Sequence, residues 1–318
     1  MKKTFPVLII AYARPEGLER IINSALVAGI TDFYIAIDGP KNFEIAQSQV
    51  LMEEFLLKIS SDKKLNLKIW KREKNLGAAC SVLTAINWFF ASEEAGMILE
   101  DDLVPSLDFF CYSSVALDKY RDYEGVWSIA GTRLLDSSSG KSDWSVYPMI
   151  WGWATWASKW QIMYPMLTSK PLSNWYRFFS PTANFWLVGA RRAQAGLIDA
   201  WDIPLAHAQM RAKKYSLIPP TNLVSNIGFD KNATHTTANT FPLNHPIENL
   251  PSNFLLPDEI SSLSAGLFDF SLMKKVYFLK KRHAFLRVWA YITDPLRYRS
   301  RAGSSLKEKL TQVNLPNL

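Results

Sequence analysis

Short apolar runs alternate with amphipathic stretches along the first 130 residues. The runs are rich in aliphatic and aromatic residues and have almost no polar positions, which is typical of strands covered on both faces. Pro15 opens a stretch in which apolar residues recur at helical spacing, and similar stretches follow the later runs. We predict strands at residues 5–12, 32–38, 65–70, 97–99 and 127–130, with a helix after each of the first four.

Four alternations of strand and helix predict an α/β fold of the Rossmann-like kind: a mostly parallel, doubly wound sheet with helices on both faces. Such sheets bind ligands beyond the carboxyl ends of their strands. Arg14, Asp38, Asn75 and the acidic triplet at 100–102 all fall at or just past these ends. We therefore expect these side chains to converge on one crevice.

The character of the sequence changes after residue 130. Residues 131–245 are rich in Trp, Pro, Asn and Ser, and they predict shorter helices. A Pro-rich stretch follows, and then a basic segment. We therefore divide the chain into residues 1–130 and 131–245, as two halves of one domain, and residues 246–318, as a linker with a basic helical extension.

Composition excludes several classes of protein. The chain has 318 residues, of which 48% are hydrophobic and 20% charged, so it can fill a core and is not disordered or collagen-like. No apolar run reaches the roughly 18 residues of a spanning helix. The two cysteines, Cys80 and Cys111, are too few for a disulfide framework and lie in no zinc motif, which favours a reducing compartment.

The positive charge is concentrated in one segment. The chain carries a net charge of +7, and residues 271–301 alone contain nine basic residues and one acid. Apolar residues are interleaved with these bases, so an interfacial helix pair on anionic lipid is one interpretation, and a solvated helix packed on the core is the other. No nucleic-acid-binding motif accompanies the charge, and we expect no nucleic-acid partner.

The turn after the first predicted strand lacks a phosphate loop. Residues 11–17 read AYARPEG, without Gly-x-Gly-x-x-Gly, and the chain has no Walker sequence. A nucleotide bound at this sheet would therefore need its phosphates neutralised by other means.

Glu100, Asp101 and Asp102 follow an apolar strand and offer those means. Carboxylates packed so closely repel one another or take up protons, whereas a divalent cation relieves the conflict and grips a diphosphate. Alternatively, the acids gather before the next helix because its dipole favours negative charge.

At these acids the sequence resembles a known family. Residues 98–103 (ILEDDL), followed by DFF at 108–110, resemble the acidic metal-binding motif of the GT-A glycosyltransferases, in the Glu-Asp-Asp form of N-acetylglucosaminyltransferase I and bacterial family 2 relatives. The resemblance spans roughly residues 5–240. Further matches occur in order: IIAYAR at 9–14, IDG at 37–39, WGW at 151–153 with Trp156, WD at 201–202, NIGF at 226–229 and ATH at 233–235.

The resemblance implies a set of donor-binding residues. Residues 1–130 would be the nucleotide-sugar half and 131–245 the acceptor-side half. Asp102 would ligate Mn²⁺ or Mg²⁺ bridging the diphosphate. The implied donor-binding residues are Arg14, Asp38, Asn75, Glu100, Asp101, Trp151, Gly152 and Trp153, with Asp101 facing the ribose; Arg14 could instead cap a strand, and Asn75 could be only a turn residue.

Three assignments keep open alternatives. The resemblance makes Asp202 the catalytic base, with Asp199 in reserve, although Asp202 could simply cap the helix that runs through Lys213. His235 is a second metal ligand or diphosphate donor, a loop residue, or a buried neutral histidine. The tryptophans at 151, 153 and 156 offer flat faces on which sugars stack, but core packing explains aromatic clusters as well.

The resemblance implies a metal-dependent inverting glycosyltransferase. It would pass N-acetylglucosamine or a similar hexose from a UDP-sugar to a glycan or lipid-linked glycan, in surface polysaccharide or glycoconjugate synthesis. With the basic extension, this places the protein in the cytoplasm, at the inner face of the cytoplasmic membrane. One alternative is a sugar nucleotidyltransferase, which should carry a Gly-rich, basic loop after its first strand. The other is a non-catalytic carbohydrate-binding or assembly protein.

Overall fold

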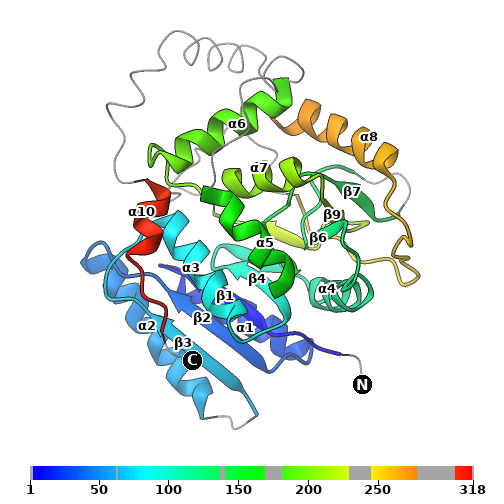
Figure 1. Cartoon of the computed structure of the whole chain (residues 1–318). Coiled ribbons are helices and arrows are strands. Elements are labelled where there is room, and N and C mark those ends of the chain that lie inside the picture. The colour runs from blue at the N-terminus through cyan, green and yellow to red at the C-terminus, as the bar shows by residue number, and fades with distance from the viewer. Residues whose placement is uncertain are drawn as a thin grey trace.

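The computed structural model describes residues 3–61, 64–136, 140–168, 181–228, 245–277 and 305–316. An eight-stranded sheet crosses the molecule in the order β3-β2-β1-β4-β8-β6-β9-β7 (Figure 1). Its strands are β1 (Val7–Ala11), β2 (Asp32–Ile37), β3 (Asn66–Lys71), β4 (Ala95–Glu100), β6 (Val126–Ala130), β7 (Asp143–Ser145), β8 (Trp153–Trp156) and β9 (Tyr215–Ile218).

Strand directions confirm the predicted mostly parallel sheet. β3, β2, β1 and β4 run parallel to one another, and β6 and β9 are also parallel. β8 is antiparallel to both β4 and β6, and β7 is antiparallel to β9. Because β7, β8 and β9 come from residues 131–245, the two predicted halves of the chain share one sheet.

Helices cover both faces of the sheet, as the apolar runs predict. In β1, Val7, Ile9 and Ala11 belong to the core beneath α1 (Pro15–Val27), α2 (Phe43–Ser60) and α4 (Leu107–Lys119). Leu8 and Ile10 belong to the opposite core, with α3 (Ala78–Phe90), α5 (Ala157–Thr168), α7 (Asp202–Ala212) and α10 (Leu306–Thr311). Alternate residues of β1 thus enter two cores, which is why the run has no polar positions.

Smaller elements complete the fold. β5 (Leu103–Pro105) and β10 (Val224–Asn226) form a two-stranded antiparallel sheet beyond the end of β4. The Ser106 hydroxyl accepts the N–H of Phe109 at 3.2 Å and caps α4. α6 (Pro181–Gln194) packs on α7, and α8 (Ser262–Leu272) packs on β7 at the end of the sheet (Figure 1).

The predicted extension at 246–318 is described only in part. Residues 245–261 contain no helix or strand, and Leu250, Phe254 and Ile260 pack on the core beneath α4. α8 continues into a π-helical turn at Met273–Tyr277. The rest of the basic segment, residues 278–301, lies outside the described residues. Within the described ranges, no helix combines the length and the apolar character that crossing a membrane requires.

Candidate functional site

The carboxyl ends of β2, β1 and β4 lie side by side. Ala11 of β1 pairs with Ile37 of β2, and Ile10 pairs with Glu100 of β4. The backbone N–H groups of Asp38 and Asp101 continue this pairing and donate to the carbonyls of Ala11 and Ile10, at 3.1 and 3.0 Å. Asp38 and Asp101 therefore flank the end of β1, at the point where the strand order reverses and α/β sheets bind ligands.

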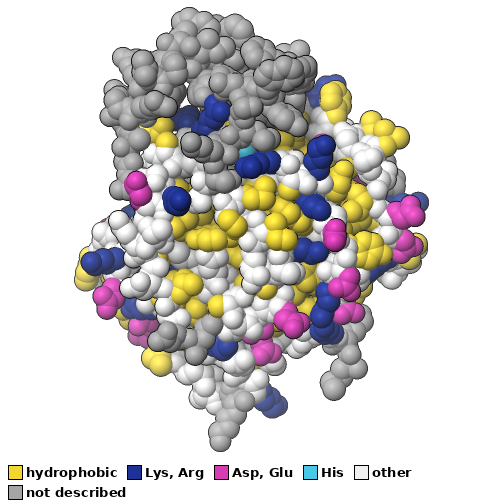
Figure 2. Space-filling view, viewed as in Figure 1, with side chains coloured by type: hydrophobic (Ala, Val, Ile, Leu, Met, Phe, Trp, Pro, Cys, Tyr) yellow, Lys and Arg dark blue, Asp and Glu magenta, His cyan; other side chains and the backbone are white. Residues whose placement is uncertain are grey.

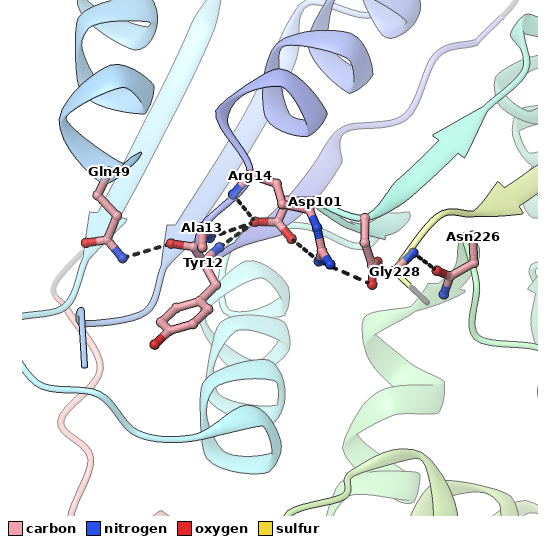
Figure 3. A network of polar contacts seen from close by, with 8 residues as sticks. Tyr12, Ala13, Arg14, Gln49, Asp101, Asn226 and Gly228 are labelled. Carbon is pink, nitrogen blue, oxygen red and sulfur yellow. Dashed lines mark hydrogen bonds and ion pairs between the residues drawn. The ribbon is translucent and has the colours of Figure 1, made fainter. Parts of the chain in front are cut away.

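Asp101 holds the turn between β1 and α1. Its Oδ2 accepts the backbone N–H groups of Tyr12, Ala13 and Arg14 at 2.7, 3.1 and 3.2 Å (Figure 3). The side chain is buried, which raises the pKa of the carboxyl, while the three N–H donors and the Arg14 guanidinium oppose that rise. The resemblance implies that Asp101 faces a ribose. In this structure its Oδ2 faces the backbone N–H groups of residues 12–14.

Asp102 lies where the start of α1 meets the end of β10. Its Oδ2 is 3.7 Å from the Arg14 guanidinium, which also lies 3.9 Å from Asp101 (Figure 3). The Asp102 carbonyl accepts the N–H of Ile227 at 3.0 Å. A Cβ on Gly228 would overlap the Asp102 carboxylate, so a glycine permits this close approach. Asp102 is partly exposed, with 24% of its side chain accessible.

Glu100 and Asp202 add two further carboxylates to this group. Burial raises the pKa of Glu100 well above its usual value, and the charges of Asp102, Asp101 and Asp202 raise it further, against the opposing charge of Arg14. Asp202 is the first residue of α7 and lies one position after the N-cap residue, Trp201. The structure therefore brings Asp101, Asp102 and Asp202 within electrostatic range of Glu100, with the Arg14 guanidinium as the opposing charge. The N-cap position of α7, which the alternative gives to Asp202, is occupied by Trp201.

These residues fit a cation bound together with a ligand rather than a cation held by protein alone. Among the described residues, no three His, Cys, Asp or Glu side chains are arranged to hold a metal ion. Mg²⁺ typically uses one or two carboxylates and completes its shell with water and substrate phosphates. Asp102 and Glu100 satisfy that requirement, and their mutual repulsion is what a cation would relieve. His235, the expected second ligand, lies outside the described residues.

Asp38 and Asn75 lie together on the other side of β1. The Asn75 amide donates to the Asp38 carboxylate at 3.0 Å and to the carbonyl of Gly39 at 2.8 Å. The Leu76 N–H also donates to the Asp38 carboxylate, at 3.1 Å. Burial raises the pKa of Asp38, and this N–H and the charge of Arg72 oppose the rise. These contacts join the β3–α3 loop to the end of β2.

Two residues that sequence reasoning missed connect the strand ends. The Gln49 amide donates to the carbonyls of Tyr12 and Asp38, at 2.9 and 2.8 Å. Burial raises the pKa of Tyr12, a hydrogen bond with the Lys41 backbone opposes the rise, and the charge of Asp38 adds to it. In Figure 3 the Tyr12 ring points away from Asp101. The sequence signals for Tyr12 are its position as the last residue of the first apolar run and its place within the IIAYAR match at 9–14.

Asp199, the reserve base, caps a helix instead. Its Oδ2 accepts the N–H of Ala78 at 2.8 Å, and its Oδ1 accepts the N–H of Ala79 at 2.9 Å. Both oxygens therefore bind the first turn of α3, whose own N-cap position, Gly77, has no side chain to do so.

The tryptophan cluster is divided between core and surface. Trp153 and Trp156 are 1% and 2% exposed, and the Trp153 ring stacks on Trp201 with centroids 6.1 Å apart. Core packing, the alternative to sugar stacking, describes both residues. Gly152 has φ +67°, a conformation that favours glycine, and a Cβ there would lie 2.7 Å from Val224. Trp151 is partly exposed, so it keeps an accessible surface.

A separate cavity lies between α1 and α4. Its volume is about 560 Å³, and Val27, Ile30, Phe110 and Cys111 contribute to its lining. No residue of the predicted site lines it, so the cavity does not mark the chemistry described above.

Comparisons with known proteins give only distant structural likenesses. No family model and no curated protein matches the sequence. Apo UDP-glucose pyrophosphorylase is similar over 68% of this chain and 90% of its own, at 11% identity and a TM-score of 0.39. HddC from Yersinia pseudotuberculosis complexed with GMP-PN is similar over 48% of this chain and 77% of its own, at 9% identity and a TM-score of 0.32. A putative glucose-1-phosphate thymidylyltransferase from Bacillus anthracis is similar over 59% of this chain and 83% of its own, at 8% identity and a TM-score of 0.34. Likenesses this weak decide nothing about the activity of this chain.

Proposed function

We propose that this protein is an enzyme that binds a nucleotide sugar at the carboxyl ends of β2, β1 and β4 and transfers the sugar with the help of a divalent cation. The observation that carries the proposal is the crowding of Asp101, Asp102 and Asp202 around Glu100 at the point where the strand order reverses. The Arg14 guanidinium pairs with Asp101 and Asp102 of this group, at 3.9 and 3.7 Å. A site with this excess of negative charge suits a cation and its diphosphate ligand.

The described residues then divide the work of binding and chemistry. The nucleoside lies over the end of β2, where Tyr12 offers a partly exposed ring and the Asp38–Asn75 pair fixes the loop. Asp102 and Glu100 hold the cation, and Arg14 balances their charge. A bound Mn²⁺ or Mg²⁺ would stabilise the leaving diphosphate. Asp202 takes the proton from the acceptor hydroxyl.

Sugar nucleotidyl transfer is the second candidate. UDP-glucose pyrophosphorylase and the thymidylyltransferase are named for this activity. It requires a triphosphate to be held near the first turn, with backbone N–H groups as the usual ligands. In this chain the N–H groups of Tyr12, Ala13 and Arg14 already donate to Asp101. Because Asp101 already accepts these N–H groups, they do not bind a triphosphate, and glycosyl transfer is the favoured reaction.

The finer assignments rest on sequence resemblance to GT-A enzymes. They are a UDP-sugar donor carrying N-acetylglucosamine or a similar hexose, a glycan or lipid-linked glycan acceptor, inversion at the anomeric carbon, and a role in surface polysaccharide synthesis at the inner face of the cytoplasmic membrane.

A thermal-shift panel tests the donor site. Nucleoside diphosphates and their sugars are added with and without Mn²⁺, because a ligand that binds only the folded state raises the melting temperature. We expect one sugar nucleotide to stabilise the protein in a Mn²⁺-dependent way and Asp102→Asn to lose the effect. Asp118 is a surface acid on α4 that pairs with Lys3, and Asp118→Asn is the matched control. A wild-type protein that responds to no nucleotide sugar would contradict the proposal.

The products distinguish the two activities. Glycosyl transfer releases a nucleoside diphosphate from the sugar nucleotide when acceptor is added. Nucleotidyl transfer releases pyrophosphate from a nucleoside triphosphate and a sugar 1-phosphate. Donor binding with neither product would leave a carbohydrate-binding or assembly role.

A further inference from the structure

α8 exposes a stripe of large apolar side chains. Leu263, Leu267 and Phe270 are 75%, 63% and 69% exposed and are spaced four and three residues apart, so they share one face of the helix. The Gly266 position is also open, with no atom within 4 Å of where a Cβ would lie. On soluble monomeric proteins, large apolar side chains are rarely exposed together unless they form a binding surface.

The stripe cannot turn inward, because the other face of α8 is fixed to the sheet. Phe268 and Leu272 are buried. The Asp269 carboxylate accepts the Ser145 hydroxyl at 2.5 Å and the N–H of Val146 at 3.1 Å, which attaches the helix to β7 and the turn after it. Exposure of the stripe is therefore a property of the folded protein.

Charge along α8 identifies the partner. Lys274 and Lys275 are exposed and lie in the π-helical turn that continues α8. They are the first basic residues of the segment 271–301, which has nine basic residues and one acid. Acids precede the helix: Asp258, which pairs with Lys119 at 2.6 Å, and Glu259. The C-terminal half of α8 is thus the part with apolar and cationic side chains together. Figure 2 shows hydrophobic side chains beside Lys and Arg side chains over α8.

We propose that the C-terminal half of α8 docks on a membrane surface that carries anionic lipid. Leu267 and Phe270 enter the boundary between headgroups and acyl chains, and Lys274 and Lys275 contact the headgroups. Exposed apolar residues beside lysines on one helix are the pattern of interfacial helices, and neither contribution alone gives stable binding. The proposal does not depend on the enzymatic activity.

A second helix provides a matched control. On α2, Phe43 and Leu57 are 75% and 71% exposed, close to the values for Phe270 and Leu267. α2 carries Glu44, Glu53 and Glu54 rather than a run of lysines. Exposed apolar area is therefore similar on the two helices, while the charge beside it differs.

Vesicle flotation of the full chain tests the proposal. We expect binding to phosphatidylcholine vesicles that contain about 30% phosphatidylglycerol and little binding to phosphatidylcholine alone. The double variant L267E/F270E should bind about tenfold more weakly or worse, and the double variant K274E/K275E should lose a similar amount. The double variant F43E/L57E should bind as the wild type does. High salt, about 0.5 M NaCl, should weaken wild-type binding. Thermal melting confirms that each variant is folded.

Each of the following outcomes overturns the proposal. If the wild-type protein does not bind anionic vesicles, the stripe is not a lipid-binding surface. Equal losses in the α2 and α8 apolar variants show a nonspecific effect of added charge. Sensitivity to the lysines without sensitivity to Leu267 and Phe270 shows electrostatic adsorption without insertion. A dimer in sedimentation velocity that L267E/F270E dissociates, without vesicle binding, assigns the stripe to a second copy of the chain.

Discussion

The carboxylate of Asp199 accepts the backbone N–H of Ala78, 121 residues earlier in the chain, at 2.8 Å. The short loop that contains Asp199 leads directly into Trp201 and Asp202, and the Trp201 ring stacks on Trp153 in the core. The start of α7 is therefore fixed between the first turn of α3 and the buried face of β8. This arrangement holds Asp202 near Glu100, so the cap sets the geometry of the proposed base.

Removing the Asp199 cap should destabilise the protein modestly. Asp199→Ala leaves two N–H groups of α3 without an acceptor, and loss of an N-cap typically lowers the free energy of unfolding by about 1 kcal/mol. Asp199→Asn keeps one acceptor oxygen and should lose less. Urea denaturation measures both, with the exposed Glu73→Ala as control. A loss no larger than that of the control would argue against the cap.

Asp101 and Asp102 are adjacent acids with different roles, and their alanine variants should differ accordingly. Asp101→Ala removes the acceptor of three backbone N–H groups, and an unsatisfied buried group costs roughly 1–3 kcal/mol, so we expect about 3 kcal/mol or more. Asp102→Ala removes one of several repelling carboxylates and should change stability by no more than about 0.5 kcal/mol. It should nevertheless abolish Mn²⁺-dependent nucleotide binding. Urea denaturation and thermal shift separate the two effects; equal destabilisation would refute the division.

Asp202→Asn should separate binding from turnover. Asn cannot accept the acceptor's proton, so transfer should fall about 100-fold or more while donor affinity stays within a factor of about two or three. The test is kcat for nucleoside diphosphate release beside the donor-induced melting shift. Near-normal turnover would remove Asp202 from the role of base, and the helix cap formed by Asp199 shows that the reserve candidate is already engaged.

The strands and their ends could be predicted because burial on both faces leaves an uninterrupted apolar run, as in β1. What could not be predicted is the difference between Asp101 and Asp102. That difference depends on how the turn at 12–14 folds back onto β4, a contact across almost 90 residues. In the sequence the two acids are equivalent members of a triplet.

The tryptophans near residue 153 show the same limit. Sequence reasoning considered Trp153 and Trp156 as sugar platforms because it could not know that β8 lies inside the sheet, between β4 and β6. A four-residue strand gives too short a pattern to reveal that both of its faces are covered. The order of β8, β6, β9 and β7 was unpredictable for the same reason, since their pairing rests on contacts distant in sequence.

Asp269 should make stability fall as pH rises above 4. Burial raises the pKa of its carboxyl to about 6 in the folded protein, against 3.8 as the ordinary value. The folded state therefore holds the proton more tightly, and this contribution is complete below pH 4 and lost as pH rises through 6. Relative to Asp269→Asn, the wild type should lose about 2 kcal/mol between pH 4 and 7. Urea denaturation of the wild type and of Asp269→Asn across this pH range measures the loss. A difference in the free energy of unfolding that does not change with pH would mean that the pKa of the carboxyl is not perturbed.

His207 should make stability rise with pH over nearly the same pH range, which is the opposite of the effect of Asp269. Burial, with the charges of Arg211 and Arg191, lowers the pKa of this histidine from 6.5 to about 4. The unfolded chain then binds a proton between pH 6.5 and 4 that the folded protein does not, so stability falls as pH falls through this window. Relative to His207→Gln, the wild type should lose about 2 kcal/mol between pH 7 and 4, with allowance for screening by solvent. The slopes of His207 and Asp269 oppose each other, so the wild type alone would conceal both. The double variant Asp269→Asn with His207→Gln provides the control, because it should retain neither slope.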